Sequence, residues 1–138
     1  MITTAADSLS SPLRNLPPAG GPRIRLLLTR AIGRQCPECG AGGIFKNWLV
    51  MLDHCPRCDY EFAREGGYFL GAYALNLIAA EFIPVGLMIA LLVWSDLNWI
   101  ALELLLIPLA VGFPFLFYPF ARTFWMALDL TFQPVNQR

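Results

Sequence analysis

Two matching cysteine pairs stand out in residues 36–62, CPECGAGGIFKNWLVMLDHCPRCDYEF. Two residues separate Cys36 from Cys39 and Cys55 from Cys58, and fifteen residues lie between the pairs. The chain contains no other cysteine. The spacing C-x2-C-x15-C-x2-C is typical of a tetrahedral four-cysteine metal site, in which two short turns each supply two thiolates.

We expect these four thiols to hold a structural zinc ion. A closed shell of four thiolates leaves no position for a catalytic water, so the metal should stabilise the fold. Iron in a rubredoxin-like site is the less favoured alternative, because spacing alone does not select the metal. Dithiol redox chemistry and disulfides are further alternatives. His54, the only histidine, adjoins Cys55 and is expected to lie near the site without replacing a thiolate.

The residues around and between the pairs suggest local structure. Gly40 and Asp59 each follow the second cysteine of a pair, where a left-handed backbone is expected. Apolar residues between the pairs recur with helical spacing, at Phe45, Trp48, Leu49 and Leu52. This spacing predicts a short helix, with a strand as the alternative. The apolar face should either complete the small metal core or rest on the lipid surface.

The chain after the cysteine pairs is almost wholly apolar. Residues 69–94 carry one charge, Glu81, and residues 99–121 carry one, Glu103. Each stretch exceeds the roughly 20 residues that a spanning helix needs, and lipid leaves helix as the natural backbone structure. The link at 95–98 is so short that the two helices must be antiparallel. We therefore predict a mainly α membrane protein, a two-helix transmembrane hairpin preceded by a small four-cysteine module.

Composition and charge support a membrane location. The chain is 57% hydrophobic and 14% charged, against about 25% charged residues in an average soluble domain. A net charge of zero gives no reason to expect nucleic-acid binding. Eight of the ten basic residues precede Tyr68 and none lies in the link. The positive-inside rule then places both termini and the module in the cytoplasm of a multi-pass inner-membrane protein, where disulfides are disfavoured.

The predicted organisation has five parts. Residues 1–22 form a tail rich in Ser, Pro and Gly, and residues 131–138 form a second tail. Between them lie an amphipathic helix at 23–35, the four-cysteine module at 36–66 and the hairpin at 67–130. The amphipathic helix has arginines opposite an apolar face, so it should lie on the anionic inner leaflet, pack on the module, or both.

Glu81 lies near the middle of the first span, where a charge costs about 2.5–3.5 kcal/mol. Pairing the two helices about their link sets Glu81 opposite Gly112 and away from Glu103. Asn76, Tyr73 and a freed backbone carbonyl then remain as partners within the chain. Glu81 is expected to be a protonated, hydrogen-bonded acid, or else a contact to a partner membrane protein, or a proton or ion site. Glu81 and Asn76 are the candidate functional residues within the membrane.

The segment GRQCPECGAGGIFKNWLVMLDHCPRCDYEF, followed by REGGYFLGAY and two spans, resembles the bacterial membrane-protein family catalogued as domain of unknown function 983. The resemblance covers about residues 32–130 and implies a zinc-ribbon-like four-cysteine module before two transmembrane helices. Its motifs are the two cysteine pairs, the Gly-x-Phe at 43–45 and the Gly-Tyr-Phe-x-Gly-Ala at 67–72. The chain departs from it at Asp59, where the family usually has Gly, and at 65–67, where many members have Asp-Gly-Pro.

The resemblance implies no established activity, although some family members are encoded beside respiratory-oxidase assembly genes. The chain shows no Ser-His-Asp set and no phosphate loop, so we do not expect an enzyme. We expect an interaction or assembly module at the cytoplasmic membrane face, with respiratory-complex biogenesis as one process. Its partners would be the bilayer and another protein or a second copy. The aromatic residues of its recognition surface would be Phe45, Trp48, Tyr60 and Phe62.

Two other functions are compatible with the sequence. One is a metal- or thiol-redox-handling membrane factor, in which the four cysteines pass on an ion or electrons. The other is oligomeric transport of a small solute or protons around Glu81, since two helices alone cannot form a pore.

Overall fold

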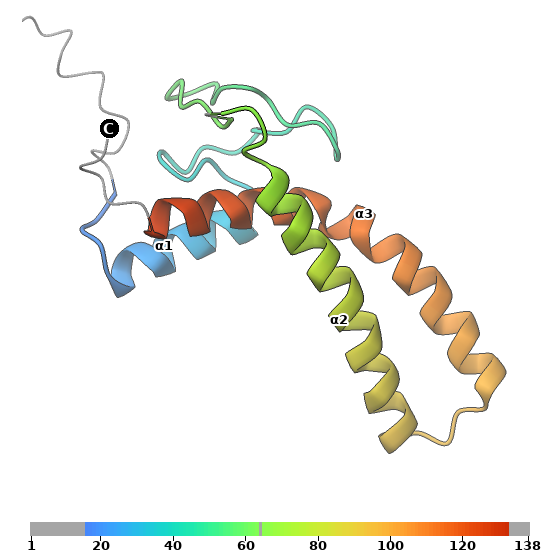
Figure 1. Cartoon of the computed structure of the whole chain (residues 1–138). Coiled ribbons are helices and arrows are strands. Elements are labelled where there is room, and N and C mark those ends of the chain that lie inside the picture. The colour runs from blue at the N-terminus through green and yellow to red at the C-terminus, as the bar shows by residue number, and fades with distance from the viewer. Residues whose placement is uncertain (1–15, 64, 133–138) are drawn as a thin grey trace, which may run out of the picture.

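The computed structural model describes residues 16–63 and 65–132, and these ranges contain three helices and no strand (Figure 1). The helices are α1 (Gly21–Ile32), α2 (Leu70–Trp94) and α3 (Trp99–Phe132). The predicted fold class is confirmed, because two helices long and apolar enough to cross a membrane follow a cluster of four cysteines. The predicted tails at 1–22 and 131–138 lie mostly outside the described residues.

α2 and α3 form an antiparallel hairpin that is tightest at the end next to the cysteine module. A Cβ atom on Gly71 would overlap the indole ring of Trp125, so only glycine admits this approach. Further along, the Asn76 side-chain amide donates a hydrogen bond to the Pro114 carbonyl at 3.1 Å. These contacts hold the two helices together over their module-side ends.

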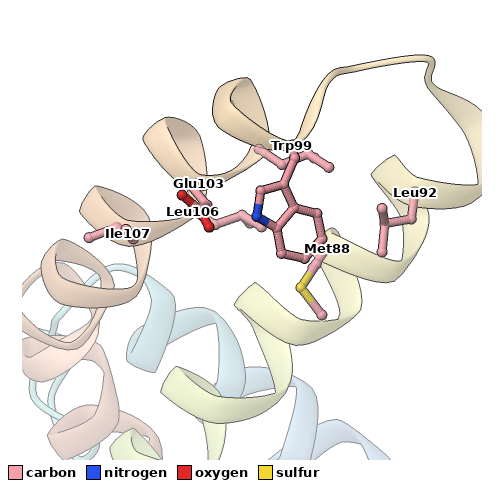
Figure 2. A pocket seen from close by; sticks show the side chains of 7 residues that line it. Met88, Leu92, Trp99, Glu103, Leu106 and Ile107 are labelled. Carbon is pink, nitrogen blue, oxygen red and sulfur yellow. The ribbon is translucent and has the colours of Figure 1, made fainter.

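The helices diverge towards their link (Figure 1). An apolar wedge of about 190 Å³ opens there, between Met88 and Leu92 on α2 and Trp99 and Ile107 on α3. Figure 2 shows the Trp99 indole extending from α3 towards Met88 across this wedge. The wedge is thus at the opposite end of the hairpin from the cysteines and forms no part of their site.

α3 continues well beyond the apolar run that ends at residue 121. Figure 1 shows its last third turning away from the hairpin and running beside α1. Pro108, Pro114 and Pro119 all lie inside the helix, and each removes a backbone N–H and favours a kink. After the bend, the Thr123 hydroxyl donates to the Ala31 carbonyl of α1 at 2.9 Å. Contact with α1 therefore stabilises the helix after the apolar run has ended.

α1 has two different apolar faces. Pro22 stands in its first turn, where the missing N–H costs nothing. Leu27 and Ala31 are buried against Ala127 and Leu130 of α3. A second face is exposed and comprises Ile24, Leu28 and Ile32. α1 therefore packs on α3 with its first face, while its second face stays exposed among the residues that the structure describes.

The four-cysteine module has its own small core, which rests on α3. Its buried members are Cys36, Ile44, Met51, Cys55, Tyr60 and Phe62, together with Met126 of α3. Because Met126 belongs to this core, the module and the end of α3 pack as one body.

The predicted helix at 45–52 is wrong, and the segment forms a short hairpin, closer to the alternative of a strand. Phe45 forms an antiparallel bridge with Met51, and the Lys46 amide donates to the Val50 carbonyl at 2.8 Å. A helix over these residues would hold its ends about 10 Å apart. The hairpin instead brings its ends together, and this lets the two cysteine pairs meet.

Candidate metal centre

The first cysteine pair lies in a tight turn closed by backbone hydrogen bonds. The Cys36 amide donates to the Ala41 carbonyl at 2.8 Å, and the Gly40 amide donates to the Cys36 carbonyl at 2.9 Å. Gly40 adopts φ 73°, in the left-handed region that glycine enters without strain. We call this turn, residues 36–41, the first knuckle.

The second pair repeats this geometry in residues 55–60, the second knuckle. The Cys55 amide donates to the Tyr60 carbonyl at 2.9 Å, and the Asp59 amide donates to the Cys55 carbonyl at 3.0 Å. Asp59 adopts φ 58°, as expected for the residue that matches Gly40. The departure from glycine at this position therefore leaves the turn intact.

The two knuckles face each other and bring the four sulfur atoms together. All four lie within 4.8 Å of one another. The Cys36 and Cys58 sulfurs are 3.7 Å apart, and those of Cys39 and Cys55 are 3.6 Å apart. A tetrahedral zinc ion with Zn–S bonds of about 2.3 Å requires neighbouring sulfurs about 3.8 Å apart. The cluster thus has nearly the size of a four-thiolate metal site, and its cysteines are free thiols.

The surroundings of the cysteines act on their pKa values in opposite directions. For Cys55, burial raises the pKa of the thiol, but the backbone N–H groups of Cys58 and Arg57 lower it further, so the net shift is downward. Burial raises the pKa of the Cys36 thiol far above its usual range, although the backbone N–H groups of Cys39 and Glu38 lower it in part. Burial also raises the pKa of Cys58 to about 12. The Ala41 amide donates to the Cys39 sulfur at 3.4 Å. Backbone donors are therefore in place around the sulfurs, and a bound cation would favour the loss of the protons from the Cys36 and Cys58 thiols.

Two charged residues beside the cluster were not identified from the sequence. Glu38 is 5% exposed, and its carboxylate lies 3.9 Å from the Cys58 sulfur. Burial raises the pKa of Glu38 to about 7, while the Cys58 thiol and the Arg30 guanidinium lower it in part. Arg30 of α1 donates to the carbonyls of Pro37 and Glu38 at 2.7 and 2.6 Å. Arg30 thus ties α1 to the first knuckle, and no spacing in the sequence distinguishes it from the other arginines.

Trp48, at the tip of the hairpin between the knuckles, binds the bend of α3. Its indole N–H donates to the Phe115 carbonyl at 2.8 Å. In a regular helix this carbonyl would accept from residue 119, but Pro119 has no N–H. The Arg34 guanidinium lies 4.7 Å from the centre of the Trp48 ring. The Trp48 side chain of the cysteine module therefore supplies the hydrogen bond that the Phe115 carbonyl of α3 lacks because Pro119 has no N–H.

The predicted aromatic recognition surface is wrong for two of its four residues. Tyr60 and Phe62 are 4% and 1% exposed and belong to the module core. Phe45 is half-buried against that core. A module this small needs large apolar side chains in its core, and Tyr60 and Phe62 supply two of them. The exposed polar residues around the second knuckle are Asp53, His54, Arg57, Asp59 and Glu61.

The structure does not bring the two candidate intramembrane residues into one site. Asn76 donates to the Pro114 carbonyl, and the Tyr73 hydroxyl lies 3.4 Å from that of Tyr118. Glu81 is exposed on α2. Within residues 16–63 and 65–132, its carboxylate has neither a hydrogen bond nor an ion pair. The expected pairing of Glu81 with Asn76 or Tyr73 is therefore absent among the described residues.

A family model described as "Protein of unknown function (DUF983)" matches residues 45–129, which is more than half of the chain. The chain belongs to this family. The DUF983 match confirms the resemblance inferred from the sequence motifs. The matched residues include Cys55, Cys58, all of α2 and nearly all of α3. Cys36 and Cys39 precede the matched residues. No curated protein and no solved structure matches the chain, so membership of DUF983 describes the architecture and assigns no activity.

Proposed function

We propose that this DUF983 protein is an interaction or assembly module that holds a partner protein at the cytoplasmic face of the inner membrane. The supporting observation is the closed cysteine cluster, in which Cys36 and Cys55 are 0% and 2% exposed. Four converging thiols, surrounded by backbone donors, are suited to hold an ion permanently and leave no position for a substrate. The role of the metal in this proposal is to fold the module.

The packing of the module supports a role as a platform. Its core shares Met126 with α3, Arg30 joins it to α1, and Trp48 joins it to the bend of α3. Three separate contacts therefore fix the module relative to the hairpin. The polar face around the second knuckle is then presented at a fixed height above the bilayer, where it would bind a partner with complementary charges and hydrogen-bonding groups.

Zinc is the metal that this proposal names, since it prefers tetrahedral thiolate sites and undergoes no redox change. Iron would fit the same sulfur geometry. Elemental analysis of the purified protein distinguishes the two, and the expected result is one zinc per chain with little iron. We propose no catalytic activity, because the residues around the cluster bury the sulfur atoms and donate hydrogen bonds to them.

The test is affinity purification of the full-length protein from native membranes in mild detergent, with mass spectrometry of the proteins that accompany it. The expected result is a reproducible partner with the native chain and its loss on Cys55→Ser, which removes a buried ligand. Arg57→Ala is the control for folding, because Arg57 lies in the same knuckle and is exposed, so this variant should keep the metal. Because Arg57 also lies on the polar face, loss of the partner from this variant with its metal in place would support binding at that face. Repeated recovery of the protein alone, with its metal in place, would contradict the proposal.

A second candidate function is the handling of metal ions or thiols. The observation that favours it is that Cys39 and Cys58 are only half-buried, so one edge of the cluster can be approached from solvent. This function requires fast release of the ion. The rate at which a mild chelator removes the bound metal measures this release. Removal within minutes supports metal handling, whereas metal that stays bound supports the interaction or assembly module.

A further inference from the structure

We infer that two apolar segments, one on α1 and one on the module hairpin, insert into the lipid–water interface of the bilayer that α2 and α3 cross. We call them the interfacial segments. They comprise Ile24, Leu28 and Ile32 on α1 and Trp48, Leu49 and Val50 on the module hairpin. This inference concerns the lipid contact of the protein and does not rest on the proposed function.

The first segment is a stripe along α1 that no described residue covers. Ile24, Leu28 and Ile32 are 41%, 38% and 62% exposed. They lie one, two and three turns along one side of the helix, about 100° around from the face that packs on α3. Arg30, which reaches the first knuckle, is about 160° around the helix from Leu28. The stripe therefore points away from the cysteine module.

The orientation of α1 places this stripe on the bilayer side. Figure 1 shows α1 and the last third of α3 running across the direction of the hairpin. The cysteine module lies on the other side of these two helices from the hairpin. Because the stripe points away from the module, it faces the side on which the hairpin enters the membrane. A helix lying in the interface plane with an apolar face towards the acyl chains has this arrangement.

The second segment is the tip of the hairpin between the knuckles. Trp48, Leu49 and Val50 are 44%, 46% and 48% exposed. The hydrogen bond of 2.8 Å from the Trp48 indole to the Phe115 carbonyl fixes the depth of this tip. Phe115 belongs to the apolar run of α3 and is itself 60% exposed. A side chain bonded to the backbone of that run must lie at the level where the run meets the lipid.

The bilayer is the occupant that these observations favour over a protein. Both segments lie at the module end of the hairpin, where lipid is necessarily present around two spanning helices. Tryptophan is the side chain enriched at this level of a membrane. Exposed basic residues, Arg25 and Lys46, flank the segments and can contact phospholipid phosphates.

Photo-crosslinking from single positions tests the inference. A benzophenone amino acid replaces Leu28, Leu49 or Arg57 in the full chain, the variants are irradiated in isolated native membranes, and adducts are identified by mass spectrometry. Metal content checks that each variant is folded. We expect phospholipid adducts from positions 28 and 49 and none from position 57, which is exposed in the second knuckle.

Four outcomes would overturn the inference. Adducts to another protein from positions 28 and 49 would show a partner on these segments, and crosslinked dimers would show a second copy. Equal lipid adducts from all three positions, or none from positions 28 and 49, would show that the segments have no special contact with lipid. None of these outcomes depends on whether a partner protein co-purifies, so the proposed function is tested separately.

Discussion

Replacing Trp48 with phenylalanine tests whether the module hairpin stabilises the bend of α3. Phenylalanine keeps an aromatic ring beside Arg34 but removes the indole N–H that donates to the Phe115 carbonyl at 2.8 Å. A hydrogen bond of this kind contributes about 0.5–1.5 kcal/mol, and an unsatisfied carbonyl away from water costs about 1–3 kcal/mol. Trp48 is 44% exposed, so we expect a loss near the lower end, about 1–2 kcal/mol.

The assay is reversible unfolding in mixed micelles, which gives the free energy of unfolding of each variant. Trp94→Phe is the matched control, since Trp94 is 84% exposed at the end of α2 and its replacement should change stability by less than about 0.5 kcal/mol. A loss of equal size in both variants would show that the cost comes from the aromatic exchange and not from the hydrogen bond.

A double-mutant cycle with Pro119→Ala isolates the hydrogen bond. The substitution restores a backbone N–H at position 119 that can bond the Phe115 carbonyl within the helix. Trp48→Phe should then cost about 1 kcal/mol less in the Pro119→Ala background than in the native one, while the effect of Pro119→Ala itself cancels from the coupling energy. The reasoning is refuted if Trp48→Phe costs the same in both backgrounds.

Other parts of the molecule give three more predictions. Gly71→Ala should cost about 1–3 kcal/mol of hairpin stability in the same assay, because the new Cβ would overlap the Trp125 ring, whereas Gly86→Ala, with open space around it, should be neutral or stabilising. Metal affinity, measured by competition with a chromophoric chelator, should fall as the pH is lowered from about 8 to about 6. The pKa of Cys58, raised to about 12 by burial, keeps its thiol protonated at neutral pH, so binding releases protons; an affinity independent of pH would contradict this. Glu81→Leu should leave the free energy of unfolding unchanged or higher, since the exposed carboxylate loses no bond to a described residue; a clear destabilisation, or a change in oligomeric state, would reveal a contact outside the single chain.

The sequence predictions that the structure confirms concern features for which a local sequence pattern is a sufficient physical cause. Turns of the form Cys-x2-Cys need left-handed backbone after the second cysteine, and both Gly40 and Asp59 adopt it. Runs of more than 20 apolar residues must be helical in lipid, and the short link forces them to be antiparallel. The candidate ligands, the two long helices and the order of module before hairpin could therefore be predicted without any tertiary information.

The predictions that failed concern short segments whose conformation or burial depends on contacts with other parts of the chain. The spacing of Phe45, Trp48 and Leu49 fits a helix, but the meeting of the knuckles requires the segment to double back. Tyr60 and Phe62 were expected on the recognition surface, yet both are buried in the module core, which has few other large apolar side chains. In both cases the contacts that decide the outcome come from residues outside the segment and cannot be inferred from its own residues.

The sequence by itself determined the four candidate sulfur ligands and the two long apolar helices, because local spacing and local hydrophobicity are sufficient physical causes of a knuckle and of a long apolar helix. Only the tertiary structure decided that α3 extends to Phe132, that Arg30 binds the first knuckle and that Trp48 reaches the Phe115 carbonyl. Those features join residues far apart in the chain. Their energies depend on distances that arise only after the module has packed on α1 and α3.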